Sequence, residues 1–359
     1  MFRYYKCLMN LVNFEGNMVT VAQFRDFILR NSCDFLFYLS LSDLCAMKSQ
    51  FPLITILGPT AVGKTAFAAN LAFRLNGEII SADSRQVFKG MDIGTGKDLA
   101  DYTIEGNVIP SHLIDIAEAG SEFNLFQFLN NFEAARLLAI SNGHVPLLCG
   151  GTGLYLEAAL LGYDLQEVPV NDNLRKELSV LNDDELVSRL SVLKPLHNTT
   201  DILDRDRLIR AIEIEWHKQN NISNRSQIDL RTTPVFGIRF DRRTSRIRIT
   251  ERLSQRLNSG LIEEVQHLLD NGISPESLKM YGLEYKYVTM YLSEELSYGQ
   301  MFAQLNTAIH QFAKRQMTWF RRMESKGIKI FWLDGEDGLK VNLQKALMYL
   351  GSFSAHIEN

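Results

Sequence analysis

The sequence predicts an α/β fold in which a parallel sheet is flanked by helices and interrupted by a helical insertion. Three observations support this prediction. From residue 51 onward, short apolar segments alternate with helical patterns, as expected of parallel strands joined by helices. A glycine-bounded loop connects the first apolar segment to the first helix. No strand pattern is visible between about residues 163 and 228, where the chain is polar and helical in character.

The composition is that of a globular protein, with 46% hydrophobic and 22% charged residues among 359. This length allows one large domain and a smaller one. The net charge of −4 excludes a protein coated in positive charge but not a local basic patch. The four cysteines form no CxxC pair and no metal spacing with histidine, which fits a reducing compartment. Because no run of about 18 apolar residues is present, we expect a cytoplasmic protein without a membrane span.

Residues 1–46 differ from the rest of the chain. They are rich in Phe, Tyr and Leu, hold three of the four cysteines and lack a cleavable signal pattern. Our preferred interpretation is that translation starts at Met47 and that this extension is an annotation artefact. The alternative is a docking helix with four apolar side chains on one face: Val21, Phe24, Phe27 and Ile28. Mass spectrometry of the native N-terminus would decide between them.

The glycine-bounded loop lies between a first strand at 52–57 and a helix at about 66–72. It reads Gly58-Pro59-Thr60-Ala61-Val62-Gly63-Lys64-Thr65. Strand, loop, Lys-Thr and helix are the context that a P-loop requires. The glycines let successive N–H groups converge on a phosphate, and the helix N-terminus adds partial positive charge. We expect Lys64 to reach the terminal phosphate and the Thr65 hydroxyl to bind Mg²⁺. The fold is therefore expected to be P-loop NTPase-like, with a bound phosphate group here.

Three further strands are predicted in the first half of the chain, at 78–82, 112–116 and 145–149. A helix is predicted at about 122–140, where apolar residues recur at helical spacing. Ligands of such sheets bind outside the carboxyl ends of the strands. The residues that follow each strand are therefore candidates for the site.

After the insertion, the strand pattern resumes at 234–240, and residues 328–333 close the sheet. Two long helical stretches are predicted between these strands, at about 244–270 and 297–324. The predicted organisation is an extension (1–46), a core in two parts (47–162 and 229–350), the helical insertion (163–228) and a tail (351–359).

Two polar segments follow predicted strands and face the P-loop. The first is Asp83-Ser84-Arg85-Gln86, and the second is Gly151-Thr152-Gly153-Leu154-Tyr155. Asp83 could hold a metal, act as a general base or cap the next helix. Its place in a polar cluster beside a phosphate site favours a functional role.

Two basic regions stand out against the acidic net charge. Residues 239–256 contain seven arginines and two acidic residues, and three of the arginines share one helix face: Arg248, Arg252 and Arg256. A solvated helix face is the alternative explanation. The second region, 313–322, combines a basic face with Trp319. Such a face suits contacts to a phosphate backbone and base stacking.

Taken together, these motifs resemble the tRNA dimethylallyltransferases, also called tRNA isopentenyltransferases. The matching blocks span roughly residues 51 to 334: 58–65, 81–95, 112–116, 150–155, 207–213 and 313–321. The resemblance implies transfer of a dimethylallyl group from dimethylallyl diphosphate to N6 of adenosine 37, next to the anticodon. It also implies Mg²⁺ as cofactor and the tRNA anticodon stem-loop as partner. We expect a monomer.

The resemblance also assigns roles to individual residues. Asp83 would be the general base, Thr65 would contact the diphosphate and the metal, and Arg242 would neutralise the leaving group. The diphosphate or nucleotide would bind at residues 58–65. The tRNA-binding positions would be Asp83, Ser84, Arg85, Gln86, Thr152, Asp206, Arg207, Leu208, Ile209, Arg210, Lys314, Arg315 and Gln316.

The chain departs from the family pattern at Asp206, where Gln is usual, at Ile309-His310, where Thr-Arg is usual, and within 281–286. These changes leave the P-loop and Asp83 intact but could alter which tRNAs are accepted. Two other functions remain open from the residues. One is a P-loop kinase that binds ATP, with Asp115 as a metal-side acid. The other is an RNA-binding duplicate that has lost its activity.

Overall fold

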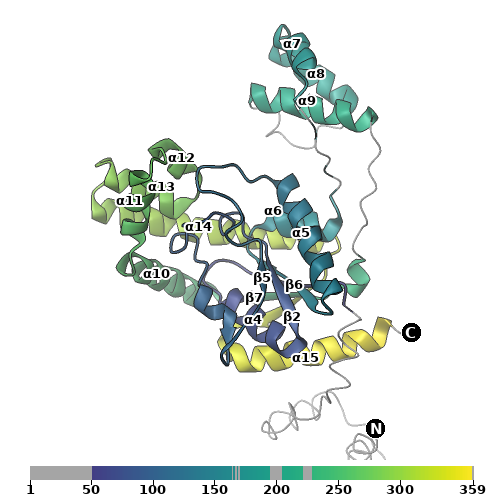
Figure 1. Ribbon diagram of the computed structural model, residues 1–359, viewed down its shortest axis with the longest axis vertical. Coiled ribbons are helices and arrows are strands. Elements are labelled where there is room, and N and C mark those ends of the chain that lie inside the picture. Colours follow the sequence, from purple (N-terminus) through teal and green to yellow (C-terminus); the bar gives the residue numbers. More distant parts are fainter. Residues whose placement is uncertain are drawn as a thin grey trace, which may run out of the picture. The chain divides into compact units, whose positions relative to one another are not determined.

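The computed structural model describes residues 51–163, 165, 168, 170–194, 204–220 and 229–357. The predictions for residues 1–46 lie outside these ranges. The described residues form a six-stranded sheet in which every neighbouring pair of strands is parallel. The predicted fold class is therefore confirmed. The strand order is β5 (Ser111–His112), β2 (Gly77–Ser81), β6 (Val145–Gly150), β1 (Ile54–Leu57), β7 (Val235–Arg239) and β8 (Ile330–Asp334) (Figure 1).

Helices cover both faces of the sheet because the central strands are apolar on both sides. One face packs against α5 (Leu125–Ser141), α6 (Gly153–Leu161) and α14 (Tyr298–Ser325), with Leu57 of β1 and the preceding Leu53 in the shared core. On the other face, Phe236 of β7 contacts Phe67 of α4 (Lys64–Leu75) and Tyr349 of α15 (Gly338–Ile357). Complete burial of such a side chain contributes about 1.5–3 kcal/mol. Packing on both faces of the sheet holds β1, and with it the loop that follows β1, in the interior of the fold.

A second core holds a helical layer beside the sheet. It joins α10 (Arg242–Asn258), α11 (Leu261–Asp270), α12 (Pro275–Met280) and α13 (Leu283–Leu292) to the first half of α14. Met91 and Phe88, from the segment that follows β2, are buried in the same core. This layer places α10 alongside the P-loop. Short elements complete the described fold: η2 (Leu99–Tyr102), the hairpin of β3 (Thr103–Ile104) and β4 (Asn107–Val108), η4 (Leu230–Thr232) and η5 (Gly335–Asp337).

The described part of the predicted insertion is helical and has its own core. It comprises α7 (Asp172–Ser179), α8 (Asp183–Leu193) and α9 (Arg205–Asn220). Asn182 and Glu185 form a capping box that starts α8. The apolar stripes of these helices pack together through leucines and an isoleucine: Leu174, Leu178, Leu186, Leu190, Leu208 and Ile212.

Glu213 of α9 links these helices through a fully buried carboxylate. It accepts two hydrogen bonds of 2.8 Å from Arg175, one of 3.0 Å from the Asn171 N–H and one of 3.1 Å from Arg210. Burial alone would raise the pKa of this carboxyl, but these donors lower it to about 2 from an ordinary 4.5. Since the folded pKa lies below the unfolded one, the stabilisation is present above pH 4.5 and disappears as the pH falls towards 2.

We expect acidification from pH 6 to pH 3 to remove about 2 kcal/mol of stability through Glu213. Urea denaturation of the wild type and of Glu213→Gln measures this, because only the wild type carries the titrating group. The variant should be less stable at pH 6 and should lose less stability on acidification. Glu177→Gln, at an exposed carboxylate of α7, is the matched control and should follow the wild type. Parallel losses in the wild type and Glu213→Gln would contradict the assignment.

The structure corrects three predicted boundaries. The third strand ends at His112 rather than 116, because Leu113 and Asp115 adopt positive φ angles of 62° and 55°. The helical stretch 244–270 is two helices, broken where Gly260 has φ of 102°. The boundary between 350 and 351 falls inside α15, so residues 351–357 continue a helix. The described helices include none long and apolar enough to cross a membrane.

Candidate active site

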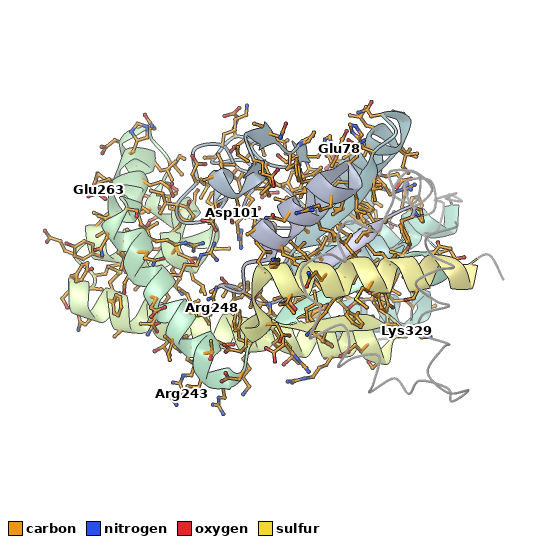
Figure 2. All side chains as sticks on the ribbon, turned by 90° about the horizontal axis from the view of Figure 1, so that it is seen from below. Glu78, Asp101, Arg243, Arg248, Glu263 and Lys329 are labelled. Carbon is orange, nitrogen blue, oxygen red and sulfur yellow. The ribbon has the colours of Figure 1, made fainter. Side chains whose placement is uncertain are left out.

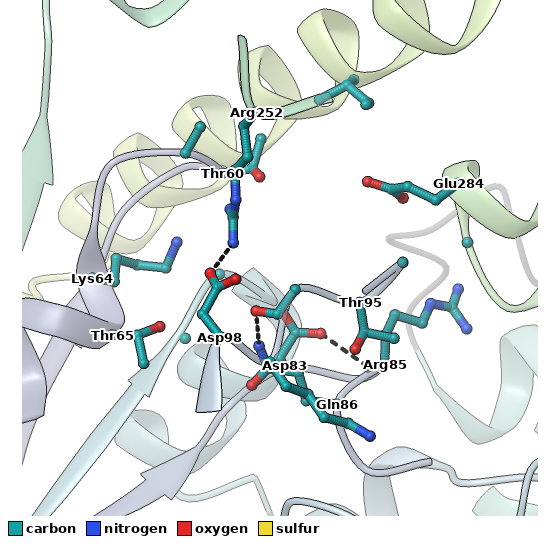
Figure 3. Close-up of a pocket in the computed structure, with 18 of the residues that line it drawn as sticks. Thr60, Lys64, Thr65, Asp83, Arg85, Gln86, Thr95, Asp98, Arg252 and Glu284 are labelled. Atoms are coloured by element: carbon teal, nitrogen blue, oxygen red, sulfur yellow. Dashed lines mark hydrogen bonds and ion pairs between the residues drawn. The ribbon is translucent and has the colours of Figure 1, made fainter. Parts of the chain in front are cut away.

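A cavity of about 1320 Å³ opens at the carboxyl ends of β1, β2 and β6. The P-loop forms one wall, and the segments after β2 and β6 form the floor (Figure 3). Helices α10 and α14 supply basic side chains from outside the sheet. The two strand ends that the sequence predicts to face the P-loop do so.

The P-loop has the curled backbone that an anion site needs. Ala61 and Gly63 adopt left-handed conformations, with φ of 65° and 80°, before α4 begins at Lys64. The backbone at position 58 lies so close to the neighbouring strand β7 that only glycine fits, since a Cβ there would lie 2.5 Å from the Ile238 carbonyl oxygen. The helix N-terminus and its free N–H groups therefore face the cavity.

Lys64 is the cation at the base of the P-loop. Its Nζ donates a 2.8 Å hydrogen bond to the Pro59 carbonyl, which folds the side chain back over the loop. Burial lowers the pKa of this amine to about 8, and the positive charge of Arg252 acts in the same direction. A bound anion would favour the protonated amine, so ligand binding and protonation of Lys64 are coupled.

We expect the affinity for inorganic diphosphate to fall above about pH 8, by up to about tenfold per pH unit, because the ligand selects the protonated amine. Isothermal titration between pH 6.5 and 9.5 measures this. Lys64→Arg is the control, since its guanidinium keeps its charge over the whole range. Ionisation of the diphosphate itself affects both proteins equally. Parallel curves for the two proteins would show that Lys64 does not titrate in this range.

The segment after β2 places Asp83 in the cavity. Its Oδ1 accepts a 2.9 Å hydrogen bond from the Arg85 N–H, which orients the carboxylate. The Ser84 N–H donates to Thr152 Oγ1 at 3.1 Å and so ties the β2 and β6 ends together. Gln86, which is predicted to contact tRNA, lines the cavity but is only 8% exposed. Its amide accepts from Ser81 Oγ at 2.9 Å and donates to the Gly96 carbonyl at 3.0 Å.

The arginine face of α10 points into the cavity. Arg248 donates to the Ala61 carbonyl at 3.0 Å, Arg252 pairs with Asp98, and Arg256 pairs with Glu284 at 3.0 Å. The alternative of a purely solvated face is therefore wrong for these three side chains.

The structure does not place Arg242 in the cavity. It is the first residue of α10, is exposed and is absent from the cavity lining. Its neighbour Arg243 projects from the outer end of the helix, whereas Arg248 lies towards the core (Figure 2). Arg252, by contrast, lines the cavity together with Lys64 and acts on the charge of its amine.

Gln316 of α14 joins the P-loop to the turn after β6. Its Oε1 accepts from the Thr60 N–H at 2.9 Å, and its Nε2 donates to the Gly151 carbonyl at 2.8 Å. The side chain is 7% exposed. These two hydrogen bonds give Gln316 a positioning role within the protein, and because the residue also lines the cavity, its tRNA contact stays a prediction. Lys314 and Arg315 on the same helix are exposed, and Arg315 lines the cavity.

The Trp319 side chain packs against Gly153 and Arg322. A Cβ at Gly153 would lie 2.4 Å from its ring, and the Arg322 guanidinium lies 5.2 Å from the ring centre. The ring lines the cavity edge. Its contacts fix the start of α6 against α14.

The predicted tRNA-binding run in α9 contains both exposed and buried residues. Asp206 and Arg207 are exposed, and Ile209 is half-buried. Leu208 is 1% exposed within the helical core, so its side chain cannot contact tRNA. Arg210 donates to the Val168 carbonyl at 2.7 Å and to Glu213, so it also serves the packing of these helices.

Sequence reasoning missed the residues that hold the segment after β2. Lys97 is fully buried and donates to the Phe88 carbonyl at 2.8 Å, to Asp92 at 2.6 Å and to Asp115. Asp115, which the kinase interpretation offered as a metal-side acid, is therefore engaged by a lysine. No local pattern marks a lysine for burial, so these partners were not predictable.

Thr65 fits a magnesium ion that arrives with a phosphate ligand. It follows Lys64 in the first turn of α4 and lines the cavity, as do Asp83, Asp98 and Asp101. The described residues contain no ready cluster of three His, Cys, Asp or Glu side chains for a metal. Mg²⁺ commonly keeps several waters and binds through few protein oxygens plus substrate phosphates. The oxygen donors here suit that mode.

Comparisons with family models, with curated proteins and with solved structures all find transferases of the same kind. The family model described as IPP transferase matches residues 86–323. The chain is 53% identical to tRNA dimethylallyltransferase 1 of Porphyromonas gingivalis, over 79% of this chain and 93% of that protein. The crystal structure of the tRNA isopentenylpyrophosphate transferase of Bacillus halodurans aligns with a TM-score of 0.61 and 30% identity, over 86% of this chain and 99% of that one. A eukaryotic dimethylallyltransferase acting on tRNA, 22% identical, shares the fold with a TM-score of 0.68 over 82% of this chain and 77% of that one.

Proposed function

Since the chain belongs to the tRNA dimethylallyltransferase family, we propose that its cavity transfers a dimethylallyl group from dimethylallyl diphosphate to N6 of adenosine 37 in tRNA. The chain is an enzyme that transfers a dimethylallyl group to tRNA. The donor, the acceptor atom and the roles of individual residues are the parts proposed here. The observation that carries them is the presence of Asp83, Lys64 and Arg252 in one cavity between the P-loop and α10.

The donor end of the reaction needs a site for a departing diphosphate. The allylic C1–O bond breaks, and its electron pair goes to the diphosphate oxygen. The P-loop N–H groups, Lys64 and Arg252 are positioned to disperse that charge, as in phosphoryl transfer. Mg²⁺, when bound near Thr65, would neutralise part of the same charge. Residues 58–65 therefore serve as the diphosphate-binding segment in this proposal.

The acceptor end needs a base. The lone pair of the adenine amino group is delocalised into the ring, which makes N6 a weak nucleophile. As the N6–C1 bond forms, the Asp83 carboxylate takes the proton that N6 loses. The hydrogen bond from the Arg85 N–H holds one carboxylate oxygen and leaves the other available. The target base must leave its stack to reach Asp83, at a cost of a few kcal/mol.

The proposed tRNA contacts come from exposed basic residues of α14, from residues that line the cavity and from exposed residues of α9. Lys314 and Arg315 of α14 are exposed next to the cavity edge formed by Trp319. Ser84, Arg85 and Thr152 line the cavity where the flipped base would enter. Asp206 and Arg207 remain proposed contacts to the anticodon stem-loop. The proposal takes a monomer as the active unit.

The proposal is tested with purified protein, Mg²⁺, labelled dimethylallyl diphosphate and unmodified tRNA carrying adenosine at position 37. Label should appear on that adenosine and should be absent from the same tRNA with guanosine at position 37. Transfer or hydrolysis of ATP phosphate in place of prenyl transfer would instead identify a kinase. Tight tRNA binding without label would identify an inactive duplicate.

A further inference from the structure

The cavity already contains an anion beside its cations. The Asp98 carboxylate pairs with the Arg252 guanidinium, and the two side chains are 44% and 28% exposed. Both line the same cavity as Lys64, and the charge of Asp98 also acts on the Lys64 amine. Figure 3 shows the Asp98 carboxylate below Arg252, between Lys64 and Asp83. A protein carboxylate thus lies where cations from the P-loop and from α10 converge.

The backbone at Asp98 is held in an uncommon conformation. Its φ and ψ of 44° and 50° lie in the left-handed region, which aspartate tolerates better than most residues. Two residues earlier, Gly96 has φ of 64°, and a Cβ there would lie 1.7 Å from Nη2 of Arg256. The chain at 96–98 is therefore pressed against the arginine face of α10.

The segment before Asp98 is firmly anchored. Glu264 of α11 accepts hydrogen bonds from three successive N–H groups, those of Asp92 at 2.8 Å, Ile93 at 2.6 Å and Gly94 at 3.0 Å. The Tyr285 hydroxyl donates to the same carboxylate at 2.7 Å. Lys97 is fixed by its buried partners at the next step of the chain. Asp98 is the first residue beyond these anchors, so its side chain can leave Arg252 without disturbing them.

We propose that Asp98 is a placeholder anion, which pairs with Arg252 until diphosphate binds and then releases this guanidinium to the diphosphate. The inference rests on the proposed function only in taking the cavity as a diphosphate site. Two anions compete for one guanidinium, so the pair with Asp98 must be broken before the diphosphate can take full contact. Asp98 therefore weakens diphosphate binding and, by returning to Arg252, assists release of the product.

The test is isothermal titration of inorganic diphosphate into the wild type and Asp98→Asn, first with EDTA and then with Mg²⁺. Asparagine is isosteric and accepts the left-handed conformation, so the local fold is kept. We expect Kd to decrease about fivefold in Asp98→Asn, as for the loss of one partly exposed competing ion pair. The dissociation rate of diphosphate should decrease as well. Asp98→Gly, which also accepts the left-handed conformation, should show the same direction of change.

Asp101→Asn is the matched control. It removes one carboxylate from the same cavity, three residues along the chain and outside the Arg252 pair. A general electrostatic effect would tighten binding equally in both variants, and this result would overturn the placeholder role. Unchanged or weaker binding by Asp98→Asn would also overturn it, and weakening only with Mg²⁺ would make Asp98 a metal ligand. A wild type that binds no diphosphate would defeat the proposed function together with this inference.

Discussion

Replacing Asp83 with asparagine is expected to slow dimethylallyl transfer to tRNA by about 10²–10⁴-fold, the usual contribution of a general base. The amide has the shape of the carboxylate and can still accept the 2.9 Å hydrogen bond from the Arg85 N–H. It cannot take the proton that N6 loses as the new bond forms. The loss should therefore appear in kcat, with little change in the binding of either substrate.

Single-turnover assays with labelled donor measure this effect, and titration with inorganic diphosphate measures the donor site separately. Diphosphate affinity in Asp83→Asn should stay within about threefold of the wild type, since the P-loop and Arg252 are untouched. Glu251→Gln is the matched control, because it removes another carboxylate that lines the cavity from α10. It should keep the wild-type rate within about threefold. A near-wild-type rate in Asp83→Asn would remove Asp83 from the role of base.

The fold was largely predictable because its signals are local. Most strands of the parallel sheet are apolar runs, and β1, β2, β6, β7 and β8 lie within about two residues of the predicted ranges. The third strand was predicted too long because an apolar run continues past His112. There the contact of Asp115 with the buried Lys97 turns the chain away from the sheet. A partner distant in the sequence decided that boundary.

The site was predictable only where function and sequence motif coincide. The P-loop and Asp83 each follow a strand, so sheet topology brings them together. Which arginine of α10 faces the cavity was not predictable in this way, because it depends on how the helix lies in the folded protein and no local motif shows that. Arg252 meets Lys64, whereas Arg242 does not reach the cavity. The inward hydrogen bonds of Gln316 were not predictable for a related reason, since a polar residue within a basic helix gives no sign that it faces inward.

Gln316→Leu is expected to weaken diphosphate binding by about tenfold in the complete absence of tRNA. The amide of Gln316 satisfies the Thr60 N–H and the Gly151 carbonyl together, and leucine satisfies neither. Each buried polar group left without a partner costs about 1–3 kcal/mol. The free energy of unfolding should therefore decrease by about 2–4 kcal/mol. Because Thr60 belongs to the phosphate-binding loop, its N–H would also lose the orientation that the hydrogen bond to Gln316 gives it.

Titration with inorganic diphosphate, urea denaturation and tRNA binding distinguish this positioning role from the tRNA contact predicted from the sequence. Lys314→Gln is the matched control on the same helix, where the side chain is exposed. It should weaken tRNA binding while leaving diphosphate affinity and stability unchanged. Gln316→Leu should show the opposite order, with diphosphate affinity and stability affected before tRNA is added. If Gln316→Leu behaved like Lys314→Gln, the two hydrogen bonds of Gln316 would not be what holds the P-loop against the β6 turn.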